Sequence, residues 1–179
     1  MPPAVVLGSV LGGLRKLRSD VARDGWSPTL ARRASAMLRI ASAIALGRPV
    51  AQTSIDRAAP EREGQVVVRR GFVRRRQAAV SAATTPQVIA KALENGHRPG
   101  AASRAALEQL RGSLETLGNA GYGRQSELDL LTLNTALEQG TDAVKQLLRE
   151  DIGRLPELLA ALPEQQQPSD DTEQLGLFQ

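Results

Sequence analysis

The side chains of this sequence best suited to bind a charged partner are arginines gathered in one short run. Residues 69–76 hold five arginines and one aromatic residue: Arg69, Arg70, Phe72, Arg74, Arg75 and Arg76. Guanidinium groups bind phosphates, and an aromatic ring among them can stack on a base or wedge into a groove. The run therefore predicts contact with DNA. The alternative is a solvated charged edge that discourages strand pairing.

That contact is expected to be non-specific and sensitive to salt, because no zinc-finger, RNA-recognition or homeodomain signature accompanies the run. Three further arginines, Arg32, Arg33 and Arg39, either extend this basic surface or form a solvated helix face. Residues 1–80 carry 15 Lys and Arg against 5 Asp and Glu, whereas residues 81–179 carry 8 against 14. Such asymmetry between the two halves favours a polyanionic partner for the first half.

Catalytic constellations are not evident. The chain has no cysteine, and its one histidine, His97, stands in a glycine- and proline-containing loop segment. The acidic pairs Glu150-Asp151 and Asp170-Asp171 are expected to be solvated rather than gathered in a metal-binding cleft. We therefore expect no enzymatic activity, no metal and no cofactor. A hydrolase that uses Glu150 or Asp151 is the least favoured alternative.

The end of the chain combines a polar segment with an apolar cluster. Residues 163–172 contain no large apolar side chain, and residues 174–179 read Gln-Leu-Gly-Leu-Phe-Gln. A segment of that composition buries too little surface to offset its ordering entropy, so residues 163–179 are predicted to be a disordered tail. An apolar cluster on such a tether needs a pocket on another molecule or on its own domain.

The tail sequence resembles the bacterial sliding-clamp-binding peptide, whose usual form is Gln-Leu-Ser/Asp-Leu-Phe. The resemblance implies that Leu177 and Phe178 fill an apolar cleft on the bacterial β clamp. It also implies that Leu175 occupies a shallower site and that Gln174 fixes the register. Gly176 departs from the usual Ser or Asp and adds backbone entropy that must be given up on binding. Affinity of the peptide alone should be about micromolar.

Composition predicts a mainly α-helical protein. Aromatic residues make up only 2% of the chain, so the core must be built from Leu, Ala, Val and Ile. No segment is long enough to span a membrane. The apolar stretch from Pro2 to Leu14 lacks a basic lead-in, which favours a buried helix over a secretory signal and a cytoplasmic location.

Helix signals divide the chain into three regions: a basic N-terminal helical region with an arginine-rich ribbon (1–80), a helical bundle region (81–162) and the tail (163–179). Asp24-Gly25 should break the first helix, Ser27 should cap a second one and Gly47 should end it. Residues 48–64 are expected to form a loop. A short basic β element is predicted near residues 65–76, with a tight turn at Arg70-Gly71.

The second half carries similar signals. Thr85 should cap a short helix, and a longer helix is expected from about residue 99 to residue 117. Ser126 and Asp129 resemble a capping box ahead of a leucine-rich helix. Gly140-Thr141 is expected to stop that helix and start another.

The favoured interpretation is a small DNA-associated accessory protein recruited to the bacterial sliding clamp through its tail. It would serve replication, repair or a mobile element, and inhibition of replication is one outcome of competing for the clamp. The alternative is a helical protein-interaction module with no role on DNA, whose leucine-rich faces also allow a homo-oligomer.

Overall fold

The computed structural model describes residues 1–55, 62–70, 76–95, 101–123 and 129–160. The tail and the segment between Arg70 and Arg76 therefore lie outside the described residues. Within the described ranges the protein is mainly helical with one small sheet, as the sequence predicted.

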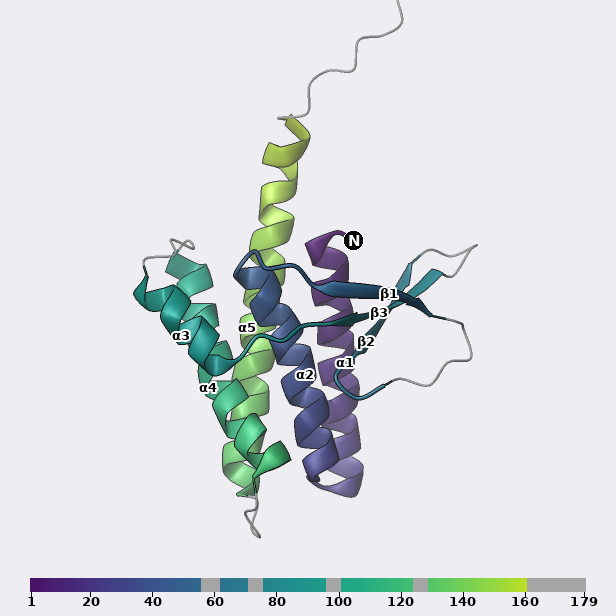
Figure 1. Cartoon of the computed structure of the whole chain (residues 1–179), viewed down its shortest axis with the longest axis vertical. Coiled ribbons are helices and arrows are strands. Elements are labelled where there is room, and N and C mark those ends of the chain that lie inside the picture. The colour runs from purple at the N-terminus through teal and green to yellow at the C-terminus, as the bar shows by residue number, and fades with distance from the viewer. Residues whose placement is uncertain (56–61, 71–75, 96–100, 124–128, 161–179) are drawn as a thin grey trace, which may run out of the picture.

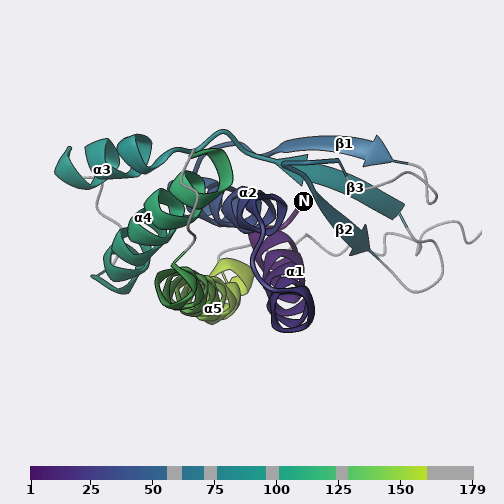
Figure 2. The ribbon, with the colours of Figure 1, turned by 90° about the horizontal axis from the view of Figure 1, so that it is seen from below.

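Long helices that run antiparallel to their neighbours form a bundle (Figure 1). They are α1 (Pro3–Asp24), α2 (Pro28–Ala45), α4 (Ala101–Tyr122) and α5 (Leu130–Ala160). The short helix α3 (Pro86–Glu94) lies against α4. Seen along the bundle, the sheet and α3 lie on the side of α2 that faces away from α5 (Figure 2).

Local signals fix the turns between the first elements. The chain leaves α1 at Gly25, whose φ of 76° is a left-handed conformation that favours glycine. The Ser27 hydroxyl then accepts a hydrogen bond from the Leu30 N–H at 3.2 Å and caps α2. Gly47 follows α2 with a φ of 64°. Thr85 caps α3 in the same way as Ser27 caps α2. These four predictions are confirmed.

Three antiparallel strands form the sheet in the order β1–β3–β2: β1 (Ala51–Ile55), β2 (Val66–Arg70) and β3 (Arg76–Ser81). The predicted loop over residues 48–64 is wrong in part, because β1 lies within it. The predicted turn at Arg70-Gly71 is also wrong, because Arg70 pairs with Arg76 and the connection comprises residues 71–75.

A continuous hydrophobic core joins the bundle to the sheet. It contains leucines from α1, α2, α4 and α5, together with Ile89 of α3. From the sheet, Val66, Val68 and Val80 enter the same core, while most of β1 is exposed. None of the described helices combines the length and the apolar character needed to cross a membrane.

Helix α5 does not stop at Gly140, contrary to prediction, but continues from Leu130 to Ala160. Gly140 is buried, and a Cβ there would lie 2.8 Å from Leu38 Cδ1 and 3.3 Å from Ser113 Oγ. The glycine therefore allows α2 and α4 to approach α5 rather than ending it. Thr141 does not cap a new helix, because its hydroxyl donates to the Leu137 carbonyl one turn earlier at 2.7 Å.

Candidate nucleic-acid interface

The strand ends bring part of the arginine run together. Arg69 and Arg70 end β2, Arg76 begins β3, and the antiparallel register places Arg70 opposite Arg76. Opposite residues of such a pair have Cα atoms about 4.5–5.5 Å apart, so the backbones of Arg70 and Arg76 lie close together. This end of the β2–β3 pair points away from the helices (Figure 1).

The remaining predicted binding residues lie outside the described residues. These are Phe72, Arg74 and Arg75 of the run, and Gln174, Leu175, Leu177 and Phe178 of the tail. Their roles therefore remain predictions from the sequence. The described residues contain no group of three or more His, Cys, Asp or Glu side chains placed to hold a metal ion.

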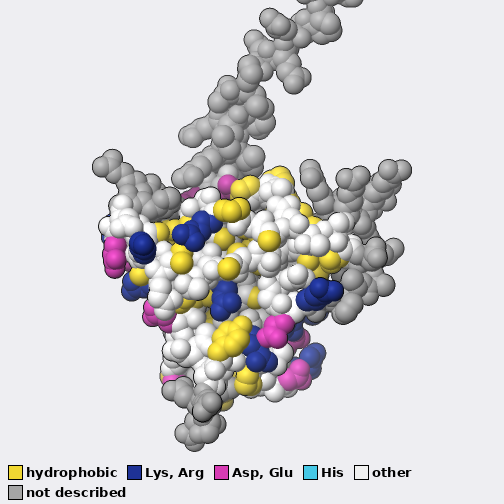
Figure 3. Space-filling view, in the orientation of Figure 1, with side chains coloured by type: hydrophobic (Ala, Val, Ile, Leu, Met, Phe, Trp, Pro, Cys, Tyr) yellow, Lys and Arg dark blue, Asp and Glu magenta, His cyan; other side chains and the backbone are white. Residues whose placement is uncertain are grey.

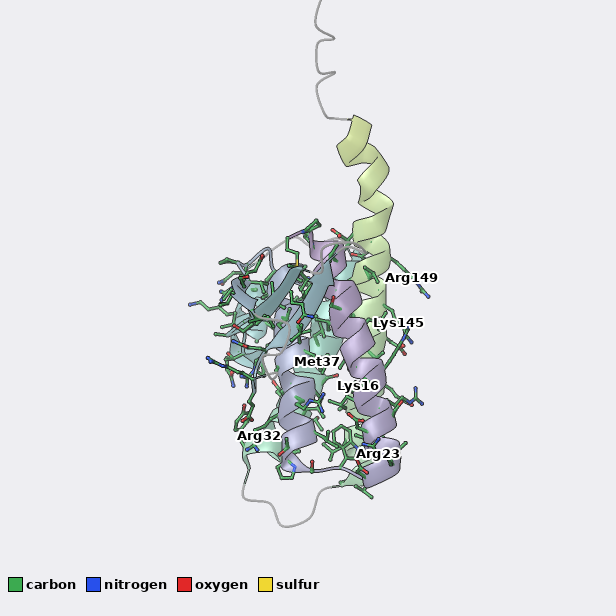
Figure 4. All side chains as sticks on the ribbon, turned by 90° about the vertical axis from the view of Figure 1, so that its right-hand side faces the viewer. Lys16, Arg23, Arg32, Met37, Lys145 and Arg149 are labelled. Carbon is green, nitrogen blue, oxygen red and sulfur yellow. The ribbon has the colours of Figure 1, made fainter. Side chains whose placement is uncertain are left out.

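A cleft of about 500 Å³ opens between α1, α2 and the chain that enters β2. Gly12 and Gly13 form its wall on α1, and Met37 forms the facing wall on α2. A Cβ at residue 13 would lie 2.9 Å from Met37 Sδ, so a larger residue there would require the Met37 side chain to move. Lys16 and Met37 lie at neighbouring levels of the two helices (Figure 4). We call this site the α1–α2 cleft.

Three cationic side chains line the α1–α2 cleft, one from each of its walls: Lys16, Arg33 and Arg62. The Arg33 guanidinium lies 3.5 Å from an Asp20 carboxylate oxygen, so its charge is partly balanced. Among the described residues, no carboxylate lies within ion-pair distance of Lys16 or Arg62. The cleft therefore presents two cations that have no acidic partner in the described structure.

One carboxylate, Glu63, also lines the cleft. Its Oε1 lies 2.6 Å from Arg32 Nε, close enough for an ion pair although the N–H is not aligned for a hydrogen bond. Because Glu63 is engaged by Arg32, it opposes an anion in the cleft less than a free carboxylate would.

A second basic feature lies where α2 and α4 meet. The guanidinium carbons of Arg32 and Arg39 lie 6.0 and 5.8 Å from the centre of the Tyr122 ring. Tyr122 is 60% exposed. On the face seen in Figure 3, Lys and Arg side chains lie among apolar and acidic ones. Arginine beside an exposed aromatic ring is a combination used by single-strand-binding surfaces.

From the sequence, Arg32, Arg33 and Arg39 have one shared predicted role, as a basic surface or a solvated helix face. Tyr122 and Lys16 have no predicted role. Arg32 and Arg39 are seven residues apart, which places them two turns apart on one helix face. That spacing was visible in the sequence. That Arg33, Lys16 and Arg62 line one cleft was not visible, because it depends on how α1, α2 and the chain entering β2 pack.

Comparison with known proteins shows no matching family model, no matching curated protein and no matching solved structure.

Proposed function

We propose that this protein is a small DNA-associated accessory factor recruited to the bacterial replication sliding clamp. The observation that carries the proposal is the sequence Gln-Leu-Gly-Leu-Phe at residues 174–178, which keeps the glutamine and the Leu-Phe pair of the clamp-binding peptide. Leu177 and Phe178 act as apolar anchors, and the Gln174 side chain fixes the register.

Contact with DNA is the second part of the proposal. Arg69, Arg70 and Arg76 meet at one end of the β2–β3 pair, and the α1–α2 cleft begins at the other end of β2. Cations that are close together in this way suit the closely spaced charges of a phosphate backbone. Because a sliding clamp encircles DNA, a tail bound to it holds this basic surface at high effective concentration near the duplex.

Binding to a purified bacterial β clamp tests the proposal directly. We expect the wild-type chain to bind with a Kd of about 1 μM, and the double substitution Leu177→Ala/Phe178→Ala to abolish binding. A matched control, Gln165→Ala/Gln166→Ala, changes the same tail outside the motif and should bind like wild type. Equal binding by the motif variant, or no binding by wild type, would remove the clamp from the proposal.

A second candidate function is a protein-interaction module that has no role on DNA. It is favoured by Leu130 and Leu131, which are 58% and 76% exposed at the start of α5. Exposed leucines side by side are typical of a surface that another protein covers. Salt-dependent binding of DNA by the full chain separates the two candidates, because the interaction module predicts none.

A further inference from the structure

The α1–α2 cleft has the size and the wall chemistry of a ligand site. Its volume of about 500 Å³ lies in the range of small-molecule pockets. Part of its lining is apolar and includes Met37, Val66 and Val67. Another part carries the cations Lys16, Arg33 and Arg62. A ligand that satisfies both parts has an anionic group joined to a flat or apolar body.

The net positive charge of the cleft indicates which kind of anion would bind there. Among the described residues, the cleft lining holds the cations Lys16, Arg33 and Arg62 and one carboxylate, Glu63, which leaves a net charge of +2. A phosphate diester or monoester matches that excess, and the ammonium and guanidinium groups supply its donors. A thioether such as that of Met37 makes favourable contacts with aromatic rings.

We propose that the α1–α2 cleft binds one nucleotide unit, with its phosphate on Lys16 and Arg62 and its base against Met37. The nucleotide belongs to a single-stranded or frayed DNA strand, a choice that rests on the proposed function. Val67 lines the cleft and Arg69 follows two residues later, about 7 Å along an extended strand. One DNA strand thus reaches from the cleft to the arginines at the end of β2.

A larger residue at Gly12 tests the cleft. Gly12 is exposed and lines the cleft, and a Cβ there would meet nothing within 4 Å, so we expect Gly12→Leu to be tolerated and to occupy part of the cleft. The change also raises helix propensity, so α1 should remain folded. Gly8→Leu is the matched control, because Gly8 is exposed in the same helix, has the same open space and does not line the cleft. Helical side chains tilt toward the N-terminus, which directs the control side chain away from the cleft.

The experiment measures binding of a fluorescent oligothymidylate and of thymidine monophosphate to the full-length chain and both variants. We expect Gly12→Leu to weaken oligonucleotide binding about tenfold, as removal of one stacked base does, and Gly8→Leu to bind like wild type. Lys16→Gln should weaken it as well, whereas Lys91→Gln, an exposed change on α3, should not. Amide NMR shifts on adding the ligand should centre on Gly12, Gly13 and Gly64.

The outcomes separate this inference from the proposed function. If Gly12→Leu binds the oligonucleotide as wild type does, the cleft inference is overturned while DNA contact stands. If wild type binds the mononucleotide in the cleft but not the oligonucleotide, the cleft takes a free nucleotide and the inference that it holds a DNA strand is overturned. If wild type binds neither, the cleft inference is overturned as a whole. Clamp binding and duplex binding are measured separately, so the proposed function does not fail with it.

Discussion

Single glycines set how closely the helices of this protein approach one another. Gly140 is the clearest case, because it is buried where α5 meets Leu38 of α2 and Ser113 of α4. Leu38 is fully buried, so its side chain has little room to move aside. A side chain at residue 140 would have to push the three helices apart.

We expect Gly140→Val to lower the free energy of unfolding by about 1–3 kcal/mol, the usual cost of overpacking a core. Gly112→Ala is the control, because Gly112 is exposed in α4 and its Cβ would meet nothing within 4 Å. That change should raise the free energy of unfolding by about 0.5–1 kcal/mol through helix propensity. Urea unfolding measures both. An unchanged Gly140→Val protein would show that the helices do not approach as closely as described.

At the scale of elements, local signals predicted helix starts better than helix continuity. Ser27 and Thr85 cap helices as expected, because a capping hydrogen bond depends only on neighbouring residues. At the start of α5 the predicted capping box falls partly on residues that the structure does not describe. Asp129 accepts hydrogen bonds from the Thr132 hydroxyl and the Leu131 N–H, and these bonds hold the pKa of Asp129 below its usual value. Ser126 lies outside the described residues.

The sequence did not predict features that form only through contact with a part of the chain far away in the sequence. Residues 51–55 read Ala-Gln-Thr-Ser-Ile and are mostly exposed, so no apolar alternation marks them as a strand. They form β1 because β3 offers a free edge, with Gln52 opposite Val80. Likewise, a glycine at residue 140 is a typical signal for the end of a helix. In the structure it lies inside α5, where it allows close packing against Leu38.

The contribution of the arginine run to DNA binding can be measured with substitutions that leave the helices and the core unchanged. We expect the triple Arg→Gln variant at residues 74–76 to weaken duplex binding. Its slope of log K against log salt should be shallower by about 0.9 for each phosphate that the variant no longer neutralises. The matched control replaces three exposed cations on the helices, Arg15, Lys91 and Arg149, with glutamine and removes the same charge. If both variants bind with equally reduced affinity, net charge rather than the run governs binding.

For the whole molecule, the sequence predicted that the first half is basic but not how its charges are arranged. Lys16 of α1, Arg33 of α2 and Arg62 ahead of β2 are far apart in the sequence and meet only in the α1–α2 cleft. The placement of these three side chains around one cleft cannot be predicted from charge counts or from periodicity, because it depends on the packing of three elements. The clamp peptide is the opposite case, since its residues are consecutive.

Two weak contacts on one chain should act together when both targets are present. The tail peptide and the basic surface each bind modestly alone, but a clamp that encircles DNA presents both targets at once. We therefore expect the full chain to bind a DNA-loaded clamp about a hundredfold more tightly than the free clamp. Surface plasmon resonance with clamp on and off primed DNA measures this ratio.

Two variants separate the contribution of the DNA contact from that of the clamp contact. The triple Arg→Gln variant at residues 74–76 should bind free clamp like wild type but bind DNA-loaded clamp only slightly more tightly. Leu177→Ala/Phe178→Ala should fail to engage the clamp in both settings. Raising the salt concentration should shrink the DNA-dependent increase for wild type, because the DNA contact is screened while the apolar peptide contact is not. A ratio near one for wild type at low salt would show that the tail and the basic surface do not engage the same clamp–DNA assembly.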